Sequence, residues 1–208
     1  MTLYRKLIVV LALVLAAGGC GFAGTAVTTD GTAMMVEDGF DVTDMTLLQS
    51  TWWTWAASAP EESNPVSDTT GEYCDDNQQV GVWLLAGSFG ETVSRECTVP
   101  AGVPVAGPAV NLVSDTRADC DQFMRDAEGV VTLNGTELPL HKANPVPITF
   151  DTVAGNPVTG EAGEFEGYGC GLWFSVDQLE PGDHELIIEG SGTGFSLSVT
   201  YALTVVAT

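Results

Sequence analysis

The sequence predicts a mostly β protein, with a single β-sandwich domain, an N-terminal helix and one further short helix. After Pro60, short apolar segments alternate with Gly, Pro, Asn and Asp, and many short strands at this spacing are typical of a sandwich or barrel. Before Pro60, one segment has instead the apolar period of a helix. We expect the domain to span residues 43–208, a length that suits one core and is short for two domains.

The expected N-terminal helix covers about residues 45–57, between a capping residue, Asp44, and Pro60. Its apolar residues recur at i, i+3, i+7 and i+10 and form one stripe, which more often docks a helix onto a core than binds a ligand. Trp53 lies just beside the stripe, where an exposed tryptophan would instead serve as a platform for a carbohydrate. The residues of the stripe are Met45, Leu48, Trp52 and Trp55.

The rest of the domain has the pattern of short strands bounded by turn residues. Asn134-Gly135 divides one of these segments into a hairpin, and residues 116–127 predict the second helix. The last two segments resemble the closing hairpin of immunoglobulin-like domains, so we expect a sandwich of the immunoglobulin-like or jelly-roll type, a likeness that concerns the fold alone. The predicted strands are 80–86, 92–99, 103–113, 130–140, 148–150, 171–176, 185–189 and 195–206.

The N-terminus has the composition of an export signal. Two basic residues among the first six precede an apolar run at 7–17, and two glycines then lead to Cys20. A charged start, an apolar stretch of about ten residues and a small-residue exit make up a secretory signal, whereas a spanning helix needs roughly 20 apolar residues. We therefore expect residues 1–19 to be a signal peptide.

Cys20 resembles the lipidated cysteine of the bacterial lipobox. Ala17 stands where that pattern prefers leucine, and the alternative is plain cleavage near Ala17 with Cys20 left as a free thiol. The other cysteines are even in number, which favours lipidation of Cys20. Because two or more acyl chains anchor a protein stably, we expect a lipoprotein held on the membrane and facing the periplasm or exterior. Residues 20–42, rich in Gly, Thr, Ala and Asp, would form a flexible tether.

The chain is strongly acidic, with 28 Asp and Glu against 6 Lys and Arg and a formal net charge of −22. Such a surface repels nucleic acid, so binding to a phosphate backbone is excluded as a function. It favours cationic partners, divalent ions or a saline habitat that screens the self-repulsion. The chain is nonetheless 45% hydrophobic, which is typical of a folded domain rather than of a disordered acidic tail.

The remaining cysteines predict two disulfides, because an even number in an exported chain is typical of a disulfide framework. Four cysteines allow three connectivities, and the sequence does not choose among them. The pairing that we predict is Cys74 with Cys97 and Cys120 with Cys170. A zinc site is disfavoured, since there is no CxxC pair and no histidine at ligand spacing.

Calcium is the one cofactor for which the sequence offers ligands. A hard cation takes six to eight oxygen ligands, and clusters of such ligands occur in two places. Neither cluster matches the EF-hand loop or a repeat-type calcium motif, and a solvated acidic face is the alternative interpretation of both. The first cluster is Asp75, Asp76 and Asn77, and the second is Asp115, Asp119 and Asp121.

Three motifs follow the tryptophan-rich helix. They are NPxxDxTGxxC at 64–74, VWxLAGxFG at 82–90 and RxCxVPAG at 95–102. Together with the helix they resemble an uncharacterised family of secreted bacterial proteins, over about residues 52–111 and the closing hairpin. The resemblance implies export, a compact β-rich domain and a disulfide between Cys74 and Cys97, and it implies no activity. The motif residues are also of architectural kinds, since Asp68 can cap a loop and Gly87 permits a tight turn.

The sequence contains no catalytic motif. Ser88 lies in a Gly-Ser-Phe-Gly segment, which is not the GxSxG elbow of hydrolases. We therefore expect no catalytic residues and a non-enzymatic extracytoplasmic module that binds an envelope or extracellular ligand or has a structural role. The alternative is a secreted carboxylate-dependent hydrolase acting on glycans. That alternative requires two carboxylates about 5–9 Å apart in a groove lined by Trp53 or Trp83, which are the candidate binding residues.

Overall fold

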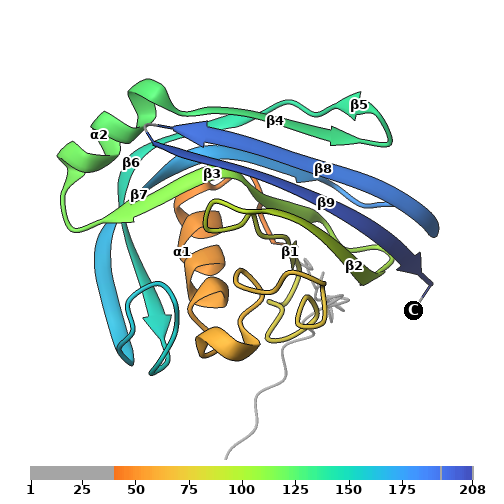
Figure 1. Cartoon of the computed structure of the whole chain (residues 1–208), viewed down its shortest axis with the longest axis horizontal. Helices are drawn as coiled ribbons and strands as arrows, with labels where there is room; N and C mark the ends of the chain where they lie inside the picture. Colours follow the sequence, from red (N-terminus) through yellow and green to blue (C-terminus); the bar gives the residue numbers. More distant parts are fainter. Residues whose placement is uncertain (1–39, 193, 208) are drawn as a thin grey trace, which may run out of the picture. The chain divides into compact units, whose positions relative to one another are not determined.

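Two β-sheets packed face to face form the domain, and a helix, α1, lies against the far side of one of them (Figure 1). The computed structural model describes residues 40–192 and 194–207, which all belong to one compact unit. The protein is therefore a mostly β sandwich with two helices, as the sequence predicts. The predicted signal peptide at 1–19 and the predicted lipidation site, Cys20, lie outside the described residues.

The sheet next to α1, here called the inner sheet, has the strand order β1-β3-β7-β6, and the outer sheet has the order β2-β9-β8-β4-β5. Most neighbouring strands are antiparallel, but β1 pairs with β3, and β2 with β9, in parallel. The predicted closing hairpin is formed by β8 and β9. The helices and strands are α1 Met45–Ala56, the 3-10 helix Glu61–Ser63, β1 Trp83–Leu84, β2 Thr92–Pro100, β3 Val105–Ser114, α2 Arg117–Asp126, β4 Glu128–Leu133, β5 Thr136–Glu137, β6 His141–Thr152, β7 Gly163–Val176, β8 Gly182–Gly192 and β9 Phe195–Val206.

Several strands differ from their predicted bounds, and β7, predicted at 171–176, already begins at Gly163. The strand predicted at 80–86 is reduced to β1, because the ladder between β1 and β3 pairs Trp83 and Leu84 and goes no further. The strand predicted at 148–150 is the end of the much longer β6. Two prolines in the 144–147 segment argue against a strand in the sequence, but β6 accommodates them with a register shift between Ala143 and Val146.

In its middle the inner sheet is buried on both faces, one against the outer sheet and the other against α1. Successive residues of β7 point to opposite faces. Phe174 belongs to the core between the two sheets, whereas Trp173 faces α1. Trp52 of α1 meets Trp173 edge to face, with 5.8 Å between ring centroids. Its Nε1 donates a hydrogen bond of 2.9 Å to the carbonyl oxygen of Leu85. The tryptophan stripe thus docks α1 onto the core, and Asp44 caps the helix as predicted, accepting from two backbone N–H groups.

Both predicted disulfides are present, Cys74–Cys97 and Cys120–Cys170. The first ties the loop after α1 to β2. The second ties α2, which lies across one end of the sandwich, to β7.

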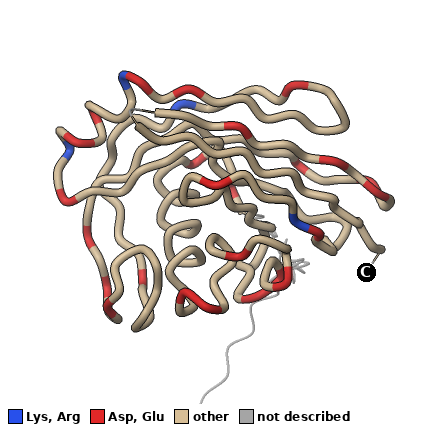
Figure 2. The backbone as a smooth tube through the Cα atoms, in the orientation of Figure 1, with Lys and Arg blue, Asp and Glu red and all other residues tan. Residues whose placement is uncertain are grey.

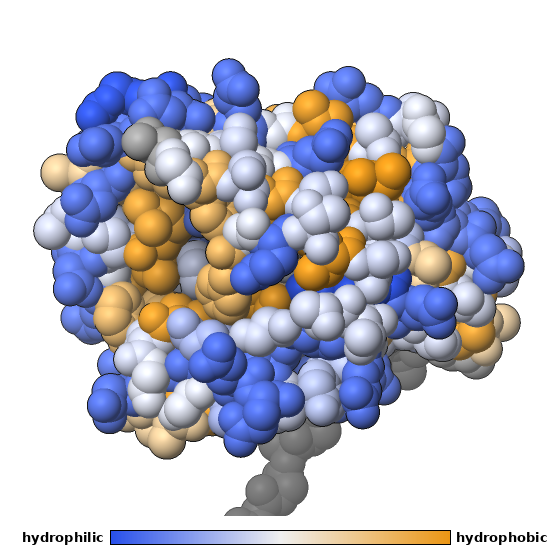
Figure 3. Space-filling view, in the orientation of Figure 1, coloured by the Kyte–Doolittle hydropathy of each residue, from blue (hydrophilic) through white to orange (hydrophobic). Residues whose placement is uncertain are grey.

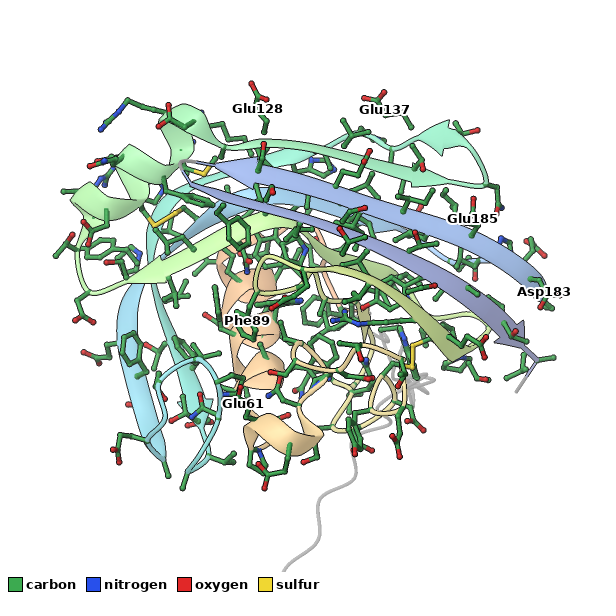
Figure 4. All side chains as sticks on the ribbon, in the orientation of Figure 1. Glu61, Phe89, Glu128, Glu137, Asp183 and Glu185 are labelled. Atoms are coloured by element: carbon green, nitrogen blue, oxygen red, sulfur yellow. A yellow bond between two sulfur atoms is a disulfide. The ribbon has the colours of Figure 1, made fainter. Side chains whose placement is uncertain are left out.

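Acidic side chains are spread over both sheets and the loops, whereas basic side chains are few (Figure 2). Four exposed carboxylates project from the strands of the outer sheet or their ends (Figure 4): Glu128, Glu137, Asp183 and Glu185. Within the described residues, no helix combines the length and the apolar character needed to cross a membrane.

Candidate functional site

The three sequence motifs meet at the side chain of Arg95, on β2. Only 1% of this residue is exposed, and its guanidinium donates hydrogen bonds of 2.7–3.0 Å to five oxygen acceptors. A buried charge is tolerated when its hydrogen-bonding capacity is used in this way. The acceptors are the carbonyl oxygens of Val66, Asp68, Ala86 and Gly87 and the hydroxyl of Tyr201.

Asp68, in the first motif, folds its own loop. Its carboxylate accepts from the backbone N–H and hydroxyl of Thr70 and from the backbone N–H of Tyr73. Burial by itself would raise the pKa of Asp68, but these hydrogen bonds, together with the charge of Arg95, outweigh it and hold the pKa below its ordinary value. The predicted loop cap at Asp68 is therefore confirmed.

The other motif residues join the same loop to α1 and β2. Asn64 donates through Nδ2 to the carbonyl oxygens of Ala56 and Ala59, at the end of α1. Gly71 has a φ of 94°, and a Cβ there would collide with the backbone of Glu96. We refer to Arg95, its acceptors and this loop as the Arg95 hub. Every contact described for the hub is internal, so its residues build the fold.

A cavity of about 240 Å³ opens beside the hub, between α1, β3 and the loop that carries Phe89. Figure 3 shows the hollow on this face, framed by apolar surface, and Figure 4 places Phe89 in front of α1. Phe89 is 47% exposed and forms part of the rim. The lining is mostly apolar and includes Trp52, Trp53, Val66, Phe89, Pro108, Val110, Leu112, Val113, Val158, Phe195 and Leu197.

Two polar hydrogen-bond donors in the lining have no partner. The Nε1 of Trp53, a residue 7% exposed, and the Nδ2 of Asn111 are both buried without a hydrogen bond. Each can only donate, so each would be satisfied by an acceptor oxygen brought into the cavity. Unpartnered buried atoms also occur below the inner sheet, at Gln49 and Trp173. The donors of Trp53 and Asn111 differ from these because they line a cavity that a ligand can enter.

The cavity exists because β1 ends early. Pro108 has no N–H with which to continue the parallel ladder from β1, and the register of β3 against β7 shifts between Pro108 and Val110. After β1, the chain moves away from β3 at Gly87 and turns toward β2. Beyond Ala106, the edge of β3 that faces away from β7 therefore has no strand partner among residues 40–192 and 194–207.

Shallower hollows extend the cavity on two sides and carry carboxylates. One shares Asn111 and Phe195 with the cavity and reaches Asp119 on α2. The other shares Phe89 and lies between Glu61 and Glu91. The cavity and these two hollows together are called the β3 groove from here on. It is apolar in the middle and acidic on both sides.

Two hydroxyl groups beside Asp119 hydrogen-bond to its carboxylate. Its carboxylate accepts from the hydroxyls of Ser114 and Thr116, at 2.6 and 2.8 Å. These two hydrogen bonds lower the pKa of Asp119, which lies on the exposed first turn of α2.

The two predicted binding residues lie in different parts of the domain. Trp53 lines the cavity, whereas Trp83 is buried in the core between the sheets and lines none of the groove. Sequence reasoning missed Phe89, Asn111 and Phe195. Two indications were available: Phe89 belongs to the motif at 82–90, and Pro108 lies inside a predicted strand, which is typical of an edge strand or a bulge.

The two predicted calcium clusters lie on opposite sides of β3 in the chain. Asp75, Asp76 and Asn77 fall in the turns before β1, where the carbonyl oxygen of Asp76 accepts from Trp55 Nε1. In the second cluster, Asp115 precedes α2, on which Asp119 and Asp121 lie. Over the part of the chain that the structure describes, no group of three or more His, Cys, Asp or Glu side chains could hold a metal ion. Calcium binding stays a prediction from the sequence.

No family model, curated protein or solved structure matches the chain. The resemblance of the three motifs to a secreted bacterial family likewise stays a prediction. The fold and the β3 groove define a candidate class, a β-sandwich with an apolar binding groove, and the function must be argued from the groove itself.

Proposed function

We propose that this protein is an extracytoplasmic, lipid-anchored binding module whose β3 groove holds an apolar group of its ligand. The observation that carries the proposal is the aromatic-lined cavity with two buried donors that lack partners. A mostly apolar pocket with a few convergent polar groups is the usual form of a ligand site.

The size of the cavity limits what enters it. Sites that enclose a whole drug-sized ligand measure roughly 300–1,000 Å³, whereas this cavity measures about 240 Å³. It suits one aromatic ring system or a short aliphatic group. The rest of the ligand would lie along the shallower hollows, where acidic residues favour positive charge.

The predicted location supports the proposal. The signal peptide and lipidated Cys20 expected from the sequence would hold the domain outside the cytoplasm, and the two disulfides suit an oxidising compartment. A groove on a tethered domain can capture a ligand at the membrane surface, which needs no chemistry from the protein.

The alternative, a carboxylate-dependent glycan hydrolase, requires two carboxylates beside a tryptophan. The described lining of the Trp53 cavity contains no Asp or Glu. Acidic pairs line only hollows that adjoin it, Glu61 with Glu91 and Glu128 with Glu189. Release of reducing sugar from envelope glycans, lost in E61Q/E91Q, would favour the hydrolase.

Binding of the neutral fluorophore N-phenyl-1-naphthylamine to the full chain tests the proposal. We expect saturable binding with enhanced emission, weakened about tenfold in Phe89→Ser, because losing the contact of a half-buried ring costs about 1.4 kcal/mol. Val80→Ser is the matched control, since Val80 is 97% exposed and lines no part of the groove. Equal affinity in Phe89→Ser and Val80→Ser, or no saturable binding, would contradict the proposal.

A further inference from the structure

We infer that the natural occupant of the β3 groove is an extended, basic peptide segment of a partner protein, which adds a strand to the free edge of β3. This inference rests on the proposed function and names its ligand class. An apolar groove alone would accept many ligands, so the inference depends on three features that a peptide satisfies together: the strand edge, the unpartnered donors and the acidic flanks.

The free edge offers main-chain hydrogen bonds. Pro108 and the register shift after it make the first part of β3 a poor partner for another strand. Val110–Ser114 is the regular stretch that remains. Five residues at about 3.4 Å per residue span roughly 17 Å. A peptide of five to seven residues would match this length. Strand addition of this kind uses main-chain bonds for affinity and side-chain pockets for selectivity.

The cavity beside that edge has the size of a side-chain pocket. Its volume of about 240 Å³ suits one aromatic or large aliphatic side chain of the added strand. A peptide also carries carbonyl oxygens at regular spacing, and the two unpartnered donors, Trp53 Nε1 and Asn111 Nδ2, need acceptors of this kind. An acyl chain would fill the cavity but leave both donors unsatisfied.

The charges around the groove select a basic peptide. Asp119 lies on one side of the cavity and Glu61 and Glu91 lie on the other, so Lys or Arg residues flanking the apolar anchor would meet carboxylates at both ends. Pairing of two β3 edges in a homodimer is disfavoured, because each copy has a formal net charge of −22.

The test is a selection of random displayed heptapeptides on the full chain, run in parallel on Phe89→Ser and Val80→Ser. We expect the full chain and Val80→Ser to enrich peptides with apolar residues at alternate positions and Lys or Arg at the ends, and Phe89→Ser to lose them. The best peptide is then N-methylated at each residue in turn. Because successive N–H groups of a strand point to opposite sides, affinity should fall about tenfold at every second position and little between.

The acidic flanks are tested with a matched pair of double variants. E61Q/E91Q should weaken the selected peptide about fivefold at low ionic strength and less at high salt. E137Q/E185Q removes two exposed carboxylates from the outer sheet (Figure 4) that line no part of the groove, and should change affinity less than twofold.

Other results would overturn the inference and identify what failed. Selected peptides without the two-residue N-methyl period would reject strand addition, and no enriched peptide would reject a peptide ligand. If N-phenyl-1-naphthylamine still binds in those cases, the proposed binding function stands. A dimer in sedimentation velocity that Phe89→Ser dissociates would assign the groove to a second copy.

Discussion

The Arg95 hub and the β3 groove lie side by side and share residues, but their buried polar atoms differ in whether they have hydrogen-bond partners. The shared residues are Val66, Ser67, Thr69 and Gly87. In the hub, a fully buried guanidinium finds five acceptors, and Asp68 collects three donors. In the groove, Trp53 and Asn111 each bury a donor without a partner, and one edge of β3 lacks a neighbouring strand in the described part of the chain.

This difference in hydrogen bonding indicates which of the two regions binds a ligand. Buried polar atoms that satisfy one another stabilise a fold and leave nothing for a ligand to bind. Polar atoms left open beside an apolar cavity lower stability but provide the differential contacts that a ligand can complete. Most of the motif residues described here belong to the first kind of region, whereas Phe89, in the second motif, lies on the rim of the groove.

The largest expected effect follows removal of the hub's central charge. Arg95→Met removes the donor to the carbonyl oxygens of Val66, Asp68 and Gly87, while Ala86 and Tyr201 keep the hydrogen bonds between them. The loss should cost about 4 kcal/mol or more. For a domain of this size that corresponds to a fall in Tm of about 10 °C or more, measurable by circular dichroism. Arg95→Lys should recover only part of the loss, because an ammonium cannot supply the same fork of donors. A Tm within 2–3 °C of the wild type would disprove the hub's structural role.

The next effect concerns the disulfide that holds the hub loop to β2. Replacing both Cys74 and Cys97 by Ala opens a link across 23 residues of sequence, and the loop entropy of that closure is worth about 3 kcal/mol. Denaturant unfolding should report this loss in the free energy of unfolding, while binding of N-phenyl-1-naphthylamine to the folded fraction stays unchanged. A loss of binding without a loss of stability would show that hub and groove are not separable.

Asp68 makes the hub sensitive to acid. Its folded pKa lies below the ordinary value of 3.8, so its contribution to stability is fully present above the unfolded pKa and is lost as pH falls through the folded pKa. Asp68→Asn should be less stable by about 1–2 kcal/mol at pH 7, and the difference should begin to shrink below about pH 4. Parallel stability curves from pH 7 to pH 3 would contradict this.

The smallest effect on stability is expected in the groove. Phe89→Ser changes a rim residue that is already 47% exposed, so the free energy of unfolding should change by about 0.5 kcal/mol or less. The same substitution should weaken ligand binding about tenfold. The measurement is urea unfolding beside the fluorescence titration, with Val80→Ser as the control. A large stability loss would place Phe89 in the core rather than in a binding site.

The sequence predicts the sandwich, both helices and both disulfides, because apolar period, turn residues and cysteine parity are local or compositional features. It also predicts that Asp68 caps a loop, since that interaction spans two to five residues. The groove could not be predicted, because it depends on which strand ends up beside β3 and on where β1 stops. Phe89 and Phe195 have no sequence relation to Trp53, and only the tertiary fold brings them to one cavity.

Hydrogen–deuterium exchange of the full chain, with and without saturating N-phenyl-1-naphthylamine, shows whether the ligand binds in the β3 groove. We predict that the ligand slows exchange in the segments that line the cavity, at residues 87–89, 108–113 and the end of α1, and leaves the loop at 68–74 unchanged. Slower exchange confined to the loop of the Arg95 hub, or a uniform change over both sheets, would contradict the assignment of the β3 groove as the binding site.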